Sequence, residues 1–400
     1  MKILLLCNKF PFPAKDGGAI ATFNLIKAFS KSGNDVTVLA MNTSKHYFNV
    51  EQLPDDIKKL AHFISVDVNN KINAVDAFIN FIQNKSYNIS RFISVKFNDR
   101  LIELLHEKEF DVVQLEGLYL SPYVETIRAF SEAKIAMRAH NIEHLIWERN
   151  AVNEKNILKK KYLKTLAKQL KKYELSRLSK YDYLIPISDV DAEYFKKLDD
   201  EIPVHVCPAS FDEELLKPDN SKTQVPSLFF LASLDWIPNV EGLKWFLDNV
   251  WGKVSAEFPE LKFYIAGRNM TDAVKKLFKK NAIMLGEIDD AYSFMNSKQI
   301  MIVPLFSGSG MRVKIIEGMA MGKVIISTAI GAEGIEAENN KNILLANNKE
   351  EFISQIRKCI TDKQICETLG ENAKKFVQDI FSARSTAKNL IDFYKKQIGK

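Results

Sequence analysis

Short runs of apolar residues alternate with amphipathic stretches along the first half of the chain. The expected strands are Lys2–Cys7, Asp35–Ala40, His62–Val66, Asp111–Leu115, Lys134–Arg138, Tyr183–Ile187 and Val204–Cys207. Each run is short and mostly apolar, as buried strands are, and helical patterns lie between most of them. Strands separated by helices predict a parallel sheet that helices cover on both faces.

A second series of the same kind follows Pro208–Pro226, a stretch rich in proline and polar residues. Its expected strands are Ser227–Ala232, Leu261–Ala266, Ile283–Gly286, Gln299–Pro304, Val324–Ser327 and Asn342–Leu345. A chain of 400 residues exceeds what one hydrophobic core usually organises. We therefore expect an α/β protein with two doubly wound domains and with ligands at the carboxyl ends of both sheets.

The composition is that of an ordinary soluble globular protein, with 46% hydrophobic and 26% charged residues. The four cysteines show no metal-ligand spacing and are too few for a disulfide scaffold, so we expect buried thiols in a reducing cytoplasm. The apolar run Met1–Cys7 is shorter than the core of a signal peptide. No stretch is apolar for long enough to span a bilayer.

The net charge of +6 is unevenly placed. Residues 154–180 predict one long amphipathic helix with ten basic residues, opposed only by Glu154 and Glu174. Two interpretations stay open. The basic face is simply solvated, or it binds anionic lipid head groups or a lipid-linked acceptor, which would make the protein peripheral on the inner face of a membrane. Nucleic acid is not expected, because no binding motif accompanies the charge.

The interval from Asn69 to Asp99 is less regular and mixes aromatic with polar residues. It reads either as short helices packed against the sheet or as an exposed segment that faces an acceptor or a membrane.

The clearest chemical signal is the segment Pro304–Ile335. A strand leads into the small-residue loop Ser307–Gly310, and a helix is expected from about Met311 to Met321. Such a loop is an anion site, because free backbone N–H groups and the positive helix end point at one place. Arg312, in the expected first turn, adds guanidinium donors for phosphate oxygens, and Glu317 can accept hydrogen bonds from sugar hydroxyls. Together they predict a bound nucleotide sugar.

Two weaker motifs also follow predicted strands. Gly17 and Gly18 begin a helix and allow close approach to a ligand, although a structural turn explains them equally well. His140 follows the strand Lys134–Arg138, where a histidine can donate to a substrate oxygen. Its spacing to His144 is not that of a zinc motif, and we assign no metal.

Two further segments have residues that are found in ligand sites. Ser188–Asp191 contains a D-x-D triplet, but a helix follows directly, so we interpret it as an N-cap. Asp235 and Trp236 lie between a strand and a helix and could face a ligand, with packing of Trp236 as the alternative.

In this order and spacing, the chain resembles a bacterial family 4 glycosyltransferase with the GT-B fold, of the branch that makes cell-surface polysaccharides and glycolipids. The segments that carry the resemblance are Gly17-Gly18, His140–Glu143, Asp235–Asn239, Ser307–Ile335 and Leu369–Tyr394. The resemblance implies two Rossmann-like domains facing each other across a cleft. Residues 1–207 would bind the acceptor, residues 208–380 would bind the donor, and the helix in 381–400 would pack back on the first domain.

The resemblance also implies a reaction and a set of residue roles. A sugar would pass from a UDP- or GDP-type nucleotide sugar to a glycan or lipid-linked acceptor, with retention of configuration and with neither cofactor nor catalytic metal. His140, Glu317 and Arg312 would be catalytic. The other implied contacts to the donor are Gly308, Ser309, Gly310, Met311, Lys314, Asp235 and the backbone at Ile288, while Gly17 and Gly18 would close over phosphates or acceptor.

Two departures from the family pattern affect the donor site. Ser309 stands where many members have a glutamate, and an Arg/Lys pair is missing after the first strand of the second domain. We hypothesise that Arg312, helped by Lys314, supplies the missing positive charge. The alternative function is a non-catalytic, sugar-nucleotide-binding assembly partner of the same fold.

Overall fold

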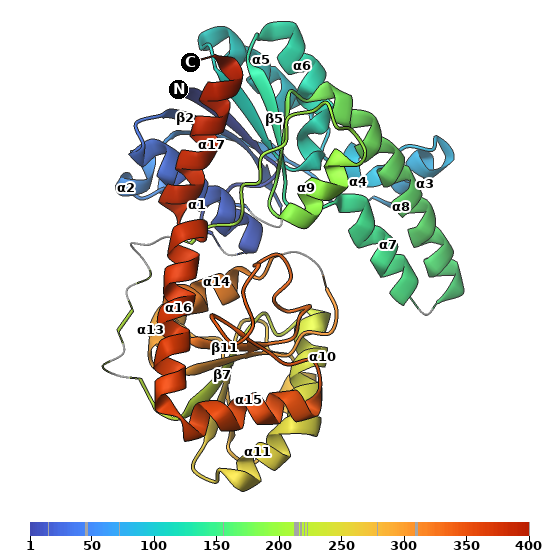
Figure 1. The fold of residues 1–400 in the computed structure, drawn as a ribbon. Coiled ribbons are helices and arrows are strands. Elements are labelled where there is room, and N and C mark those ends of the chain that lie inside the picture. The colour runs from blue at the N-terminus through green and yellow to red at the C-terminus, as the bar shows by residue number, and fades with distance from the viewer. Residues whose placement is uncertain are drawn as a thin grey trace. The chain divides into compact units, whose positions relative to one another are not determined.

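The structure is a computed structural model that describes residues 1–14, 16–44, 47–71, 73–154, 156–211, 216, 218–219, 221, 223–277, 279–308 and 311–399. The chain divides into two compact units (Figure 1). The N-terminal unit comprises Met1–Ala209 and Ala383–Lys400, and the C-terminal unit comprises Ser210–Ser382. This division lies two residues after the boundary expected between 207 and 208.

The N-terminal unit is built on one parallel sheet with the strand order β3-β2-β1-β4-β5-β6. Its strands are β1 (Lys2–Cys7), β2 (Asp35–Thr43), β3 (His62–Val68), β4 (Val112–Glu116), β5 (Lys134–Ala139) and β6 (Tyr183–Pro186). In this register Leu4 pairs with Thr37 on one side and with Val113 on the other. The strand order reverses between β1 and β4, which leaves a crevice at their carboxyl ends.

One expected strand is absent. Residues 204–207 form no strand, and only Val204 pairs with Leu184 as an isolated bridge at the edge of β6. The segment lies between Pro203 and Pro208. The N–H groups of His205 and Cys207 still donate to the carbonyls of Leu184 and Pro186, so the segment runs along β6 without forming a regular strand.

Helices cover both faces of this sheet. The helices of this unit are α1 (Gly17–Lys31), α2 (Asp55–Lys58), α3 (Ala74–Ile82), α4 (Tyr87–Ser90), α5 (Val95–Glu107), α6 (Val124–Phe130), α7 (Glu143–Asn153), α8 (Ile157–Arg177), α9 (Asp189–Lys196) and α17 (Ala383–Ile398), with 3-10 turns at Val50–Gln52, Leu118–Tyr123 and Leu178–Lys180. Alternate residues of β1 enter two cores: Leu4 packs in the core that includes Phe97 of α5, and Leu5 in the core that includes Leu25 of α1 and Leu390 of α17. This explains why the strand is apolar throughout.

The C-terminal unit repeats this plan with the order β12-β11-β10-β7-β8-β9. Its strands are β7 (Ser227–Leu231), β8 (Lys262–Ala266), β9 (Ala282–Gly286), β10 (Ile300–Val303), β11 (Val324–Ser327) and β12 (Leu344–Leu345). Its helices are α10 (Ile237–Phe246), a π-helical turn (Leu247–Trp251), α11 (Gly252–Glu257), α12 (Asp272–Lys275), α13 (Ala291–Asn296), α14 (Val313–Ala320), α15 (Lys349–Thr361) and α16 (Lys363–Phe381). The order reverses between β7 and β10.

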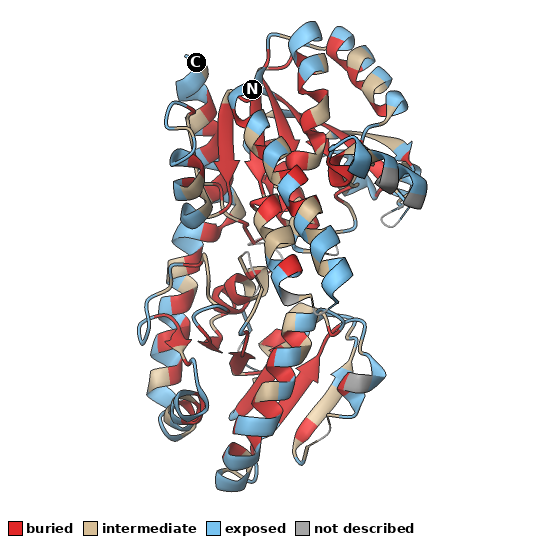
Figure 2. Cartoon of the chain, turned by 90° about the vertical axis from the view of Figure 1, so that its right-hand side faces the viewer, coloured by how far each residue is buried: buried red, intermediate tan, exposed pale blue. Residues whose placement is uncertain are grey.

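The burial pattern confirms the predicted α/β class. The strands of each sheet are largely buried, while the outer faces of the helices are exposed (Figure 2). All four cysteines are buried free thiols, as expected. Ser188 accepts a hydrogen bond from the Asp191 N–H at the start of α9, which confirms its interpretation as an N-cap. In the part of the chain that the structure describes, no helix is long and apolar enough to cross a membrane.

Candidate functional site

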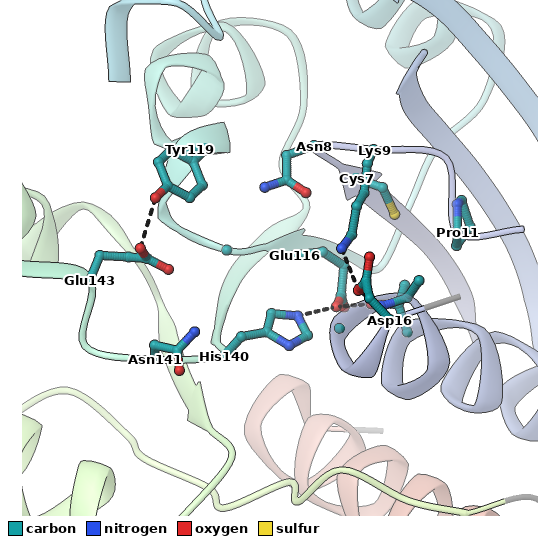
Figure 3. A pocket seen from close by; sticks show the side chains of 14 residues that line it. Cys7, Asn8, Lys9, Pro11, Asp16, Glu116, Tyr119, His140, Asn141 and Glu143 are labelled. Atoms are coloured by element: carbon teal, nitrogen blue, oxygen red, sulfur yellow. Dashed lines mark hydrogen bonds and ion pairs between the residues drawn. The ribbon is translucent and has the colours of Figure 1, made fainter. Parts of the chain in front are cut away.

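A pocket of about 250 Å³ opens at the carboxyl ends of β1, β4 and β5 (Figure 3). It therefore lies at the point where the strand order of the N-terminal unit reverses. Its lining residues are Cys7, Asn8, Lys9, Pro11, Asp16, Gly18, Ala19, Thr22, Glu116, Gly117, Tyr119, His140, Asn141 and Glu143.

Two of the predicted site residues line this pocket. His140 extends from the loop after β5, and its Nε2 lies 2.8 Å from Oε2 of Glu116. Gly18 lines the pocket from the first turn of α1, where Asp16 caps the helix by accepting from the Ala19 N–H. Gly17, the first residue of α1, is exposed and is not among the lining residues.

The pocket also contains a carboxyl group that holds its proton near neutral pH. Tyr119 donates a hydrogen bond of 2.8 Å to Glu143, the first residue of α7. Burial raises the pKa of Glu143 to about 7, although the Tyr119 hydrogen bond acts in the opposite direction. Glu143 can therefore donate as well as accept hydrogen bonds in this pH range.

His144, one residue further, has a structural role. Its ring is buried, with Nδ1 2.7 Å from Glu174 and Nε2 3.0 Å from the Tyr194 hydroxyl. Glu174 also accepts the His144 N–H and so fixes the start of α7.

In the C-terminal unit, the loop after β10 brings a glycine, a tryptophan and an arginine together. Gly308 has φ +104°, and a Cβ atom there would lie 2.9 Å from both the Arg312 guanidinium and the Trp236 ring. The Arg312 guanidinium carbon lies 5.3 Å from the centre of that ring, in cation–π contact. Ser309 and Gly310 lie outside the described residues.

The prediction that the helix after this loop starts at about Met311 is wrong. Helix α14 begins at Val313, and Arg312 precedes it as the N-cap residue with φ −91° and ψ 88°. Arg312 is buried, and its backbone leaves the helical conformation where its side chain stacks on Trp236. Arg312 therefore lies one residue before the helix instead of in its first turn.

Lys314 and Glu317 of α14 lie behind this arginine. The Lys314 ammonium donates to the Leu231 carbonyl at the end of β7, at 2.8 Å, and the Tyr292 hydroxyl donates to Glu317 at 3.2 Å. Burial lowers the pKa of Lys314 to about 8; Glu317 opposes this shift, whereas Arg312 and Arg268 add to it. The positive charges of Arg312 and Arg268 thus act on the ammonium of Lys314. Three neighbouring cations favour the binding of an anion at this site.

The other predicted donor residues lie at the same edge of the sheet. Asp235 follows β7 and accepts from Ser233 at 2.7 Å and from Asn269 at 3.1 Å, which joins the loops after β7 and β8. Ile288 lies in the loop after β9 and is partly buried, and Met311 packs on the core beside α14.

Several site residues were missed by the sequence analysis. In the N-terminal unit they are Lys9, Asp16, Glu116 and Tyr119, and in the C-terminal unit they are Arg268 and Tyr292. Two of them could have been predicted from the sequence. Glu116 directly follows a predicted strand, and Arg268 lies two residues after another. Parallel sheets bind their ligands at such positions, at the carboxyl ends of the strands.

Residues 225–362 match the family model described as glycosyl transferases group 1. These residues form a group 1 glycosyltransferase domain. An uncharacterised 44.6 kDa protein in the cps region of Klebsiella pneumoniae is 24% identical over 405 residues, which cover 97% of this chain and 98% of that protein.

Solved structures share this fold. Sucrose-phosphate synthase from Thermosynechococcus elongatus superposes with a TM-score of 0.73 at 14% identity and with full coverage of both chains. Anabaena Alr3699/HepE, solved in complex with UDP-glucose, gives a TM-score of 0.67 at 14% identity over 99% of this chain and 100% of that one. The glycosyltransferase therefore has the GT-B fold, with two Rossmann-like units.

The environment of Glu317 makes the stability of the glycosyltransferase depend on pH. Burial raises the pKa of Glu317 to about 7, against the opposing effects of Tyr292 and Lys314. Between about pH 4.5 and 7 the folded chain keeps a proton that the unfolded chain has released, so the free energy of unfolding falls as pH rises. Glu317→Gln cannot titrate. We expect it to exceed the wild type in stability above pH 7, by up to roughly 3 kcal/mol.

Urea unfolding at about pH 5 and pH 8 measures this difference. Glu371→Gln, at an exposed position of the same unit, is the matched control and should leave the pH dependence unchanged. Parallel pH profiles for the wild type and Glu317→Gln would contradict this account of the site.

Proposed function

We propose that this glycosyltransferase moves a sugar from a nucleoside-diphosphate sugar of the UDP or GDP type to a glycan or lipid-linked acceptor. The product would belong to surface polysaccharide or glycoconjugate synthesis. In this proposal the transfer retains the anomeric configuration and uses side-chain cations in place of a catalytic metal. Two relatives motivate it: the Klebsiella protein lies in a cps region, and the Anabaena structure contains UDP-glucose.

The observation that carries the proposal is the arrangement at the reversal point of the C-terminal sheet. Arg312 stands before the N-terminus of α14, beside Gly308, with Lys314 behind it and Glu317 one turn further along. A diphosphate would meet the guanidinium, the N–H groups of the helix end and the ammonium, while Glu317 would accept from ribose hydroxyls. Such preorganised donors stabilise the charge that develops on the leaving phosphate.

Arg268 supports the hypothesis that other residues supply the positive charge of the missing Arg/Lys pair. It follows β8, next to β7 in the sheet, and its charge acts on Lys314. Arg312, Lys314 and Arg268 together would provide more than the roughly two positive charges that a diphosphate requires. The family's missing Arg/Lys pair is thus replaced from the loops after β8 and β10.

Removal of the stacked guanidinium tests the donor site. For Arg312→Ala we expect a higher KM for the nucleotide sugar and a kcat lower by a factor of about a hundred or more, because the group acts on the leaving phosphate. Steady-state kinetics of sugar release or transfer measure both constants. Arg357→Ala, an exposed arginine of the same unit that pairs with Glu257, is the matched control and should behave as the wild type.

Near-normal kinetics of Arg312→Ala would contradict the assignment. Donor binding by the wild type without any turnover would instead support the non-catalytic binder.

We further propose that the N-terminal unit binds the surface of an anionic membrane on its cytoplasmic face. Helix α8 carries an exposed lysine stripe, Lys161, Lys164, Lys168 and Lys172, at helical spacing. Helix α3 lies beside it (Figure 1): Tyr162 and Phe81 have ring centres 6.2 Å apart, and Gln169 donates to the Phe81 carbonyl.

Apolar side chains beside this stripe are unusually exposed. On α3 they are Val75 and Ile82, with exposed fractions of 65% and 67%, and at the α7–α8 turn they are Ile157 and Leu158, both at 81%. Lysines next to exposed aliphatic side chains are typical of surfaces that bind anionic lipids. Leu158, in the first turn of α8, therefore faces outward and not toward a core.

Vesicle sedimentation tests this surface. With all four lysines of the stripe changed to Gln, we expect binding to vesicles of phosphatidylcholine and phosphatidylglycerol to weaken by at least tenfold at low salt, since each lysine contributes about 1 kcal/mol. The matched control changes four exposed lysines of the C-terminal unit, Lys253, Lys349, Lys363 and Lys375. Equal binding by both variants, or binding to pure phosphatidylcholine that salt does not alter, would refute the proposal.

A further inference from the structure

A buried carboxylate lies behind His140. Glu116, the last residue of β4, is 4% exposed. Its Oε2 accepts hydrogen bonds from the Thr22 hydroxyl at 2.8 Å and from the Arg138 guanidinium at 3.2 Å, and it lies 2.8 Å from Nε2 of His140. Its Oε1 accepts from the side-chain amide of Gln114.

The direction of these hydrogen bonds is set by the neighbours. Arg138 can only donate. Gln114 has its amide oriented by Tyr394 of α17, whose hydroxyl donates to Oε1 of Gln114 at 2.7 Å, so its NH₂ group faces Glu116. Tyr394 is fully buried, so this series of hydrogen bonds extends from the C-terminal helix to the pocket.

The carboxylate is therefore an acceptor in every one of these contacts. Burial would raise the pKa of Glu116, but the Arg138 charge and the His140 hydrogen bond outweigh it and hold the pKa at about 2. An ionised carboxylate has no proton to give. The proton between it and His140 must then lie on Nε2 of the imidazole.

We infer that Glu116 is a positioning residue that holds His140 in the Nε2–H form and leaves Nδ1 as an acceptor for a sugar hydroxyl in the pocket. The identity of that hydroxyl rests on the proposed function. In Figure 3 the second ring nitrogen of His140 points away from Glu116. Nδ1 of His140 thus accepts from a substrate hydroxyl, instead of donating to a substrate oxygen as the sequence suggested.

A second buried pair of the same kind provides an internal reference. His144 meets Glu174 through Nδ1, and its Nε2 faces the Tyr194 hydroxyl. Glu174 also accepts the backbone N–H groups of Glu143 and His144, so it acts as an acceptor and we assign the Nδ1–H form to His144. The two histidines should therefore carry their protons on opposite nitrogens.

Nitrogen-15 NMR of the full chain labelled at histidine distinguishes the two forms without any substrate. At about pH 8 we expect His140 as Nε2–H and His144 as Nδ1–H. In Glu116→Gln the amide can donate to Nε2, so a second tautomer of His140 should appear. Glu174→Gln, the matched control, should alter the His144 signals alone. Tyr394→Phe is a second variant, which frees the Gln114 amide and should shift His140 in the same direction as Glu116→Gln.

A double-mutant cycle adds a kinetic test. We expect Glu116→Gln to lower kcat at least tenfold with a smaller effect on KM, and to change kcat less than threefold when His140 is already Ala. An Nδ1–H tautomer of His140 in the wild type, or equal kinetic losses in both backgrounds, would overturn the inference. The expected tautomers in a chain that transfers no sugar would instead refute the proposed function and leave the inference intact.

Discussion

The constraint on which the rest depends is the parallel pairing of every strand in both sheets. Parallel strands end on the same side, so the loops that follow them converge on one edge. In the N-terminal unit these loops bring Glu116 and His140 to one pocket. In the C-terminal unit they bring Trp236, Arg268 and Arg312 to one side of the sheet. Both sheets reverse order between their first and fourth strands, and in the N-terminal unit the pocket lies at that point.

The buried charged side chains of the two units have different surroundings. Glu116 has a complete set of donors and stays ionised, so it can hold a neighbouring ring in place. In the C-terminal site burial lowers the pKa of Lys314, with the charges of Arg312 and Arg268 adding to this shift, and burial raises the pKa of Glu317. Such a site is destabilised until an anion binds. The first arrangement suits a positioning role and the second suits recognition of a diphosphate.

The fold followed closely from the sequence, because buried parallel strands are continuous apolar runs that local pattern detects. The exception was residues 204–207, an apolar run between two prolines. Site residues that follow strands, such as His140 and Gly308, were found for the same reason. Arg312 was misplaced relative to its helix, since its conformation depends on a contact with Trp236 that is distant in sequence. Glu116 and Tyr394 were missed because their network forms only when strand and C-terminal helix meet.

Binding of the donor to the C-terminal unit tests the central claim most directly. Trp236, Trp245 and Trp251, three of the four tryptophans, belong to that unit, so fluorescence reports its unfolding. A panel of UDP- and GDP-sugars should contain a ligand that, at about a hundred times its Kd, stabilises the wild type by roughly 2.7 kcal/mol. Glu317→Ala should lose this effect. Stabilisation by no member of the panel, or by equal amounts in wild type and variant, would contradict the account.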